Sequence, residues 1–166
     1  MAEPQRIVIL GGGIGGVVAA RRIRSLVPGD SRVILVDRQA LQSFPPSYTW
    51  VMTGERSPAS ITRDLRRLSR KGIEFVEGAV EAIDVEKRTI TAGGAEIAYD
   101  YLVVALGAEL APDAVPGLAG EACSYYRADD AERLHAELER FSGGRVAVLI
   151  PSLPYKCPAA PYEGAM

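Results

Sequence analysis

A Gly-x-Gly-x-x-Gly pattern, formed by Gly11, Gly13 and Gly16, follows directly after the apolar run Arg6–Leu10. In this pattern the first glycine permits a tight turn, and the second lets the backbone approach a pyrophosphate group. The third lets the following helix pack closely on the strand. The N–H groups and the dipole at the start of that helix favour a bound phosphate, so the pattern indicates a dinucleotide site.

An acidic residue supports this interpretation. Asp37 lies 21 residues after Gly16, at the end of the apolar run Arg32–Val36, where a carboxylate can accept hydrogen bonds from ribose hydroxyls. Asp37 also disfavours a nucleotide with a 2′-phosphate, although the adjacent Arg38 weakens that argument. These residues leave FAD and NAD as equal candidates. A glycine-rich turn without a ligand is the alternative.

A second apolar run leads into a turn with different chemistry. Arg145–Ile150 is followed by Pro151–Pro161, which contains four prolines and no glycine. Such a segment cannot form the tight turn that admits a pyrophosphate, so NAD(P)H binding at this point is disfavoured.

Two cysteines are candidates for redox chemistry. Cys157 lies beside Lys156 and just ahead of a helix predicted near Ala160, and a cation and a helix N-terminus both favour the nucleophilic thiolate. A buried structural cysteine is the alternative. Cys123, next to the aromatic pair Tyr125-Tyr126, fits either role.

The composition limits the classes of function. The 166 residues include 48% hydrophobic and 24% charged residues, as in a globular protein, and a formal charge of −2 gives no indication of a nucleic-acid partner. Two cysteines are too few for a secreted disulfide framework, and no metal site is expected. The apolar runs are of strand length, and no signal sequence is recognised, so we expect a cytoplasmic protein.

The turn requires a strand, a helix and a second strand around it. The pattern predicts strands at residues 6–10 and 32–36 with a helix at 14–26, which together form a βαβ unit. Gln42–Gly54 is predicted as a loop, and Ser60–Lys71 as a helix whose arginines form a solvated face or bind a phosphate. Short strands are predicted at 73–76, 80–85, 88–91, 96–99 and 101–106, with a hairpin at Gly93-Gly94.

The rest of the chain is expected to begin a second domain. Glu109–Gly120 is predicted as a connector, 127–141 as a helix carrying a surface histidine, His135, and 145–150 as the first strand. The second strand of that βαβ unit is missing, so we expect the sequence to be part of a longer protein. The predicted domains are residues 1–110 and 111–166. The expected fold is α/β, a Rossmann-like domain with an inserted antiparallel β-meander and the start of a second, incomplete Rossmann-like domain.

Several segments together carry a resemblance to a known family. Tyr101–Gly107 resembles the second FAD-contacting strand of flavoproteins with two dinucleotide-binding domains, with Leu106 in place of the usual threonine. Gly11–Gly16, Phe44–Ser47 with Trp50 and Gly54, residues 99–104 and above all residues 154–163 extend the resemblance. The chain resembles the sulfide:quinone oxidoreductases and the flavoprotein subunit of flavocytochrome c sulfide dehydrogenase.

This resemblance implies a chemistry. Cys157 would form a redox disulfide with a cysteine from the C-terminal half, and sulfide or a related sulfur compound would attack it. Two electrons would then pass to FAD and on to quinone, or to cytochrome c in the second type. Phe44–Trp50 would border the flavin ring.

The resemblance and the turn together define the expected site. The catalytic candidates are Cys157 and, with an open role, Cys123. The cofactor-binding candidates are Gly11, Gly13, Ile14, Gly15, Gly16, Asp37, Arg38, Pro46, Ser47, Val80, Ala105 and Gly107. A non-catalytic nucleotide-binding module is the alternative function. Peripheral membrane contact is expected only through a C-terminal part that this sequence lacks, and the oligomeric state is left open.

Overall fold

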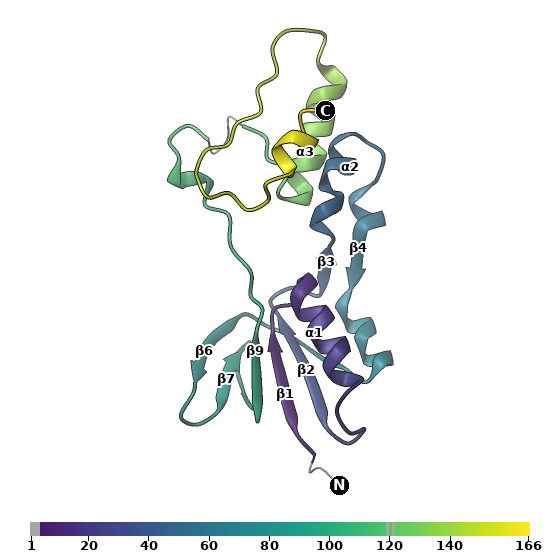
Figure 1. The fold of residues 1–166 in the computed structure, drawn as a ribbon, viewed down its shortest axis with the longest axis vertical. Helices are drawn as coiled ribbons and strands as arrows, with labels where there is room; N and C mark the ends of the chain where they lie inside the picture. The colour runs from purple at the N-terminus through teal and green to yellow at the C-terminus, as the bar shows by residue number, and fades with distance from the viewer. Residues whose placement is uncertain (1–3, 119, 121) are drawn as a thin grey trace. The chain divides into compact units, whose positions relative to one another are not determined.

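The computed structural model (Figure 1) describes residues 4–118, 120 and 122–166, which divide into two compact units. The first unit comprises Met1–Gln42 and Arg63–Ala108, and the second comprises Ser43–Thr62 and Glu109–Met166. Because residues 43–62 belong with the C-terminal part, the division is not a single cut in the sequence. The domain limits predicted at residues 110 and 111 stay a prediction.

A four-stranded parallel sheet forms the centre of the first unit. Its strands are β1 (Arg6–Leu10), β2 (Arg32–Asp37), β5 (Glu74–Glu77) and β9 (Tyr101–Val104), in the order β5-β2-β1-β9. The central strands β1 and β2 are nearly continuous apolar runs because they are buried on both faces. The predicted βαβ unit and the α/β fold are confirmed.

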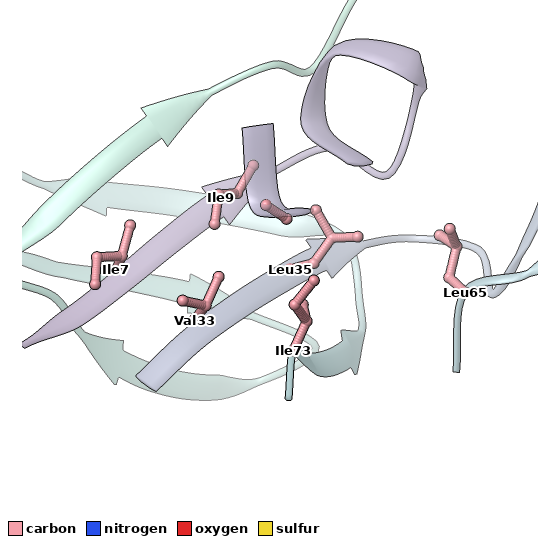
Figure 2. Packing of buried hydrophobic residues seen from close by; sticks show 7 residues of the cluster. Ile7, Ile9, Val33, Leu35, Leu65 and Ile73 are labelled. Atoms are coloured by element: carbon pink, nitrogen blue, oxygen red, sulfur yellow. The ribbon is translucent and has the colours of Figure 1, made fainter. Parts of the chain in front are cut away.

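Helical segments cover one face of this sheet. The helix α1 (Ile14–Arg24) and the 3₁₀ helix η3 (Leu65–Lys71) pack on it through Ala20 and Leu65. Figure 2 shows the apolar side chains of this layer, which come from β1, β2 and the segments flanking them: Ile7, Ile9, Val33, Leu35, Leu65 and Ile73. Burial of these side chains fixes α1 and η3 on this face of the sheet.

An antiparallel β-meander covers the other face. Its strands are β6 (Val80–Asp84), β7 (Thr89–Ala92) and β8 (Ala95–Ala98). Ile90 packs with Val8 and Ile34 in a second apolar cluster. The tight turn between β7 and β8 is made by Gly93 and Gly94, both with positive φ, as the glycine pair predicted.

Two predicted segments differ in the structure. The predicted loop 42–54 contains the end of β3 (Leu41–Ser43), the 3₁₀ helix η1 (Pro45–Ser47) and the helix α2 (Tyr48–Met52). The predicted helix 60–71 is divided into η2 (Pro58–Ile61), β4 (Thr62–Asp64) and η3, because β4 pairs with β3. Asp64 then caps η3 by accepting the N–H of Arg66 at 3.0 Å.

The second unit has a small helical core. The helix α3 (Ala128–Arg140) packs on α2 and η2 around Tyr48, Val51, Ile61 and the fully buried Ala131. Two shorter elements, η4 (Pro112–Ala114) and α4 (Ala160–Glu163), complete this unit. The side of α3 that packs inward presents Ala131. Leu138, and Phe141 just after the helix, are exposed instead.

The predicted first strand of a second Rossmann-like domain is wrong for this structure. Residues 145–150 form no strand and are exposed, with Leu149 at 67%. A buried strand requires a neighbour to which its N–H and C=O groups can bond, and no strand in the described part of the second unit pairs with this segment. Apolar content alone therefore does not produce a strand here.

Candidate functional site

Two glycines of the turn are required by close packing within the protein. Gly11 has a φ of +100°, and a Cβ there would overlap the carbonyl oxygen of Ala105. A Cβ at Gly16, at the start of α1, would overlap the carbonyl oxygen of Gly11. The turn is held by the N–H of Gly11, which donates to Val36 at 2.8 Å. These contacts explain the first and third glycines of the pattern.

Two other glycines face open space. A Cβ built at Gly13 or Gly15 would meet no atom within 4 Å, so packing does not explain these glycines. Gly13 is the N-cap of α1, no side chain caps it, and the first turn of α1 carries no acidic residue. Ile14 between them is also half exposed. The start of α1 thus leaves room and N–H donors for an anionic group.

The expected ribose-binding acid is fixed beside this turn. Asp37 ends β2, and its Oδ2 accepts the N–H of Gly12 at 2.6 Å while its Oδ1 accepts the N–H of Gln39 at 2.9 Å. Each carboxylate oxygen retains capacity for a further hydrogen bond, because an ionised carboxylate has about four acceptor positions. The turn and Asp37 therefore fit a dinucleotide. Arg38 follows Asp37 and is exposed.

The other cofactor-binding candidates of the first unit differ in how close they lie to the glycine turn. Ala105 donates its N–H to Leu10 at 2.8 Å and lies against Gly11, so the structure brings it to the turn. Gly107 has a φ of +75° and open space around it. The side chain of Val80 packs on the apolar cluster beneath the β-meander, and its cofactor contact stays a prediction.

In the second unit, Pro46 and Ser47 lie in η1. Ser47 is fully buried, and its Oγ accepts a hydrogen bond from Nη1 of Arg56 at 2.9 Å. The guanidinium of Arg56 also lies over the ring of Trp50, 4.0 Å from its centroid. Arg56 was missed by sequence reasoning, because a cation six residues after a tryptophan has no periodic signal.

The two cysteines, also in the second unit, are free thiols and half-buried. The carbonyl oxygen of Cys157 accepts the N–H of Ala160 at 3.3 Å, and Ala160 in turn accepts the hydroxyl of Tyr125 at 3.0 Å. The predicted helix after Cys157 exists as α4, but it has only four residues. A helix this short has a small dipole, so the predicted effect of a helix N-terminus at Cys157 is weak.

An aromatic pair adjoins the Cys157 segment. The rings of Tyr125 and Tyr126 are stacked with centroids 5.8 Å apart, and the ring of Tyr125 lies directly against Gly164. Burial raises the pKa of both tyrosines, and the neighbouring Cys157 raises these pKa values further. Both hydroxyl groups therefore keep their protons at neutral pH.

His135 was predicted to be a surface residue, but in the structure it packs against the end of α2. Its ring is half-buried, with Nδ1 3.2 Å from the carbonyl oxygen of Met52 at the end of α2. Gly54, with a φ of +79°, makes room for the ring, because a Cβ there would lie 2.5 Å from Cε1 of His135. This contact explains the glycine and gives His135 a packing role.

Across residues 4–118, 120 and 122–166, no group of three or more His, Cys, Asp or Glu side chains could hold a metal ion. The helices within those same residues are all too short or too polar to cross a bilayer.

Comparisons with known proteins place the chain in a family. Residues 5–149 match the pyridine nucleotide-disulphide oxidoreductase family, whose members bind FAD. The chain is 31% identical over 165 residues to a sulfide-quinone reductase of Aquifex aeolicus, covering 98% of this chain and 38% of that protein. It is 35% identical over 153 residues to an alternative NAD(P)H-ubiquinone oxidoreductase of Arabidopsis thaliana, covering 81% of this chain and 30% of that protein.

A solved structure supports the same relationship. The sulfide:quinone oxidoreductase of Aquifex aeolicus superimposes with a TM-score of 0.76 at 30% identity, over 82% of this chain and 32% of that one. The chain thus spans about a third of the length of these relatives. The family match and this superposition agree with the parallel sheet and the glycine turn. We conclude that the chain belongs to the pyridine nucleotide-disulphide oxidoreductase family and carries an oxidoreductase domain.

Proposed function

We propose that the chain binds FAD at the glycine turn and forms part of an enzyme that oxidises sulfide and delivers two electrons to quinone. The observation that carries this proposal is the similarity to the Aquifex sulfide-quinone reductase, which extends over 98% of the chain. That similarity includes both units, and therefore both the dinucleotide turn and the Cys157 segment. The sulfur substrate and the quinone are proposals for the whole protein.

The residues of the first unit have a binding role in this proposal. The N–H groups at the start of α1 hold the pyrophosphate, which approaches over Gly13 and Gly15 because no side chain fills that space. The carboxylate of Asp37 accepts ribose hydroxyls with the capacity left by its bonds to Gly12 and Gln39. Bound FAD would supply a two-electron acceptor.

Cys157 has the chemical role. We infer that the thiols of Cys157 and a second cysteine form a disulfide by giving up two protons and two electrons, for which bound FAD would be the acceptor, and that hydrosulfide attacks this disulfide. One sulfur becomes a persulfide and the other leaves as a thiolate, so atoms and charge balance. Cys123 is the second candidate thiol, and replacing it by serine tests whether it takes part.

NAD(P)H-linked reduction of quinone is the second candidate function. The 35% identity to the Arabidopsis oxidoreductase favours it. The segment Pro151–Pro161 opposes it, because four prolines and no glycine leave no room for a second pyrophosphate turn. Two further alternatives are a cytochrome c-linked dehydrogenase and a non-catalytic module. The flavin measurement described next distinguishes both from the proposed function.

The test follows the flavin absorbance of the purified, FAD-loaded protein under anaerobic conditions. We expect sulfide to bleach the flavin band and NADH to leave it unchanged, and we expect Cys157→Ala to abolish bleaching while FAD stays bound. Reoxidation by a soluble quinone rather than cytochrome c supports the quinone acceptor. Bleaching by NADH alone contradicts the sulfide proposal and supports the second candidate, and no bleaching by either reductant supports a non-catalytic module.

A further inference from the structure

The outward side of the helical layer in the first unit is strongly basic. Neither α1 nor η3 contains an acidic residue. Together these two helices carry seven cations: Arg21, Arg22, Arg24, Arg66, Arg67, Arg70 and Lys71. The chain as a whole has a formal charge of −2, so this concentration of positive charge is local.

The two helices expose this charge on one face of the sheet. Both pack inward on the same apolar cluster, α1 through Ala20 and Ile23 and η3 through Leu65 and Leu68. Their C-terminal ends adjoin, because a Cβ at Gly72 would lie 3.5 Å from Cδ of Arg24. Because the apolar side chains of both helices belong to this cluster, the exposed cations lie on the outer side of the layer.

Two of these seven cations have structural roles. Arg24 donates hydrogen bonds to the carbonyl groups of Val27, Pro28 and Ser31, in the turn after α1. Arg66 forms ion pairs with Asp64 and Glu77, at 3.6 and 3.1 Å. These contacts hold the turn and the start of η3.

The remaining five cations define the basic face: Arg21, Arg22, Arg67, Arg70 and Lys71. All five are exposed, and no ion pair joins them to an acidic side chain among the described residues. Asp30 lines the same shallow cleft as Lys71, while Glu74 in that cleft is already paired with Arg32 at 2.6 Å. The basic face therefore keeps a net positive charge.

Exposed apolar side chains lie on the same helix as part of this charge. Val18, one turn before Arg21 and Arg22, is 61% exposed, and Leu26, just beyond the end of α1, is 65% exposed. A soluble polyanion would satisfy the arginines but leave both apolar side chains in water. The interface of an anionic bilayer accommodates both, because phosphates meet the cations while apolar groups enter the headgroup region.

We propose that the basic face binds the surface of anionic phospholipid bilayers, with its cations at lipid phosphates and Val18 and Leu26 in the headgroup layer. This inference rests on charge and exposure in the first unit and is independent of the proposed redox function.

The test is co-sedimentation of the full chain with vesicles. We expect binding to vesicles of phosphatidylglycerol and phosphatidylcholine in equal amounts, and no binding to phosphatidylcholine alone. Each cation near the surface contributes about fivefold in partitioning, so Arg21→Gln with Arg22→Gln should weaken binding about 25-fold. The matched control is Lys87→Gln with Arg88→Gln, which removes the same charge from the β-meander on the opposite face and should change binding less than twofold.

A second variant distinguishes a bilayer from a soluble polyanion. Leu26→Ser should weaken vesicle binding several-fold and leave retention on heparin unchanged, because only the bilayer accepts the apolar side chain. Equal binding to neutral vesicles, equal losses in the two charge variants, or no effect of Leu26→Ser on vesicle binding would each overturn the proposal. Circular dichroism checks that the variants, all at exposed positions, are folded.

Discussion

The carboxylate of Asp37 accepts the backbone N–H of Gly12 at 2.6 Å, which ties the end of β2 to the middle of the glycine turn. Its second oxygen accepts the N–H of Gln39, so one side chain organises the backbone on both sides of the site. A residue selected in the sequence for a ribose therefore also shapes the turn that approaches the phosphate.

This double role predicts graded effects of substitution. Asp37→Ala leaves the N–H groups of Gly12 and Gln39 without their acceptor, and we expect it to lower the free energy of unfolding by about 1–3 kcal/mol. Asp37→Asn retains an acceptor oxygen and should be less destabilising. Both variants should weaken FAD binding about tenfold or more, because the charged acceptor for the ribose is lost. Urea unfolding and titration calorimetry measure the two effects, and an Asp37→Ala variant unchanged in both would contradict the assignment.

The sequence was sufficient to predict the parallel sheet, α1 and the β-meander of the first unit for a physical reason. Its central strands β1 and β2 are continuous apolar runs and its β7–β8 turn contains a glycine pair, so local pattern and tertiary packing agree there. The roles of Gly13 and Gly15 could not be separated from those of Gly11 and Gly16 by spacing alone. That separation required the position of the Ala105 carbonyl, which comes from a strand about 90 residues away in sequence.

The second unit was harder to predict. Its core joins residues 48–61 to residue 131, and no local period reveals that Ala131 rather than Leu138 packs inward. The run 145–150 has the composition of a strand but lacks a paired neighbour. Here tertiary context, which a single sequence does not contain, decides the structure.

Arg56 offers a test of how the η1 turn is held. Arg56→Gln removes the charge over Trp50 and weakens the bond to the buried hydroxyl of Ser47, so we expect a loss of about 1–2 kcal/mol in stability. Trp50 is the single tryptophan of the chain, so its fluorescence reports this site directly. The emission should change in the folded variant. Arg56→Lys keeps the charge but loses the planar guanidinium group, and it is the matched control. Its stability should lie between those of the parent and Arg56→Gln.

The ion pair of Arg32 and Glu74 predicts a pH dependence. The hydrogen bond from Arg32 lowers the pKa of Glu74 below its ordinary value, so the pair stabilises the protein above that value. The contribution is lost as the pH falls from about 4.3, the ordinary pKa of glutamate, through the lowered pKa. Both side chains are about half exposed, at 52% and 47%, so the pair contributes at most about 1 kcal/mol.

Denaturant unfolding of Glu74→Gln across pH checks this expectation. The variant should be slightly less stable than the parent at neutral pH and equal to it in acid. In an Arg32→Gln background the same substitution should have a much smaller effect, because only the charge of Arg6 still acts on Glu74. A stability difference that persists in acid would mean that packing rather than charge is responsible.

Tyr125 connects the helical core of the second unit to the Cys157 segment. Tyr125→Phe removes only the hydroxyl that donates to Ala160, the residue whose N–H bonds the Cys157 carbonyl. Release of this bond should raise the alkylation rate of Cys157 about fivefold, which corresponds to a hydrogen bond of about 1 kcal/mol. Peptide mass spectrometry distinguishes Cys157 from Cys123, whose rate should stay constant. Tyr162→Phe, at an exposed tyrosine of the same segment, is the control, and equal acceleration of both cysteines would indicate general loosening instead.

The most direct measurement of the central claim compares FAD binding by two glycine variants of the turn. In Gly13→Ala the new Cβ would meet no atom within 4 Å, and the φ of −68° at this residue is one that alanine adopts. The protein should therefore keep its stability within about 0.5 kcal/mol. Gly16→Ala meets the carbonyl of Gly11 and should destabilise the fold itself. If the open space over Gly13 admits the pyrophosphate, Gly13→Ala will be folded and will bind FAD at least about tenfold more weakly in titration calorimetry. A folded Gly13→Ala variant that binds FAD as tightly as the parent would contradict the account.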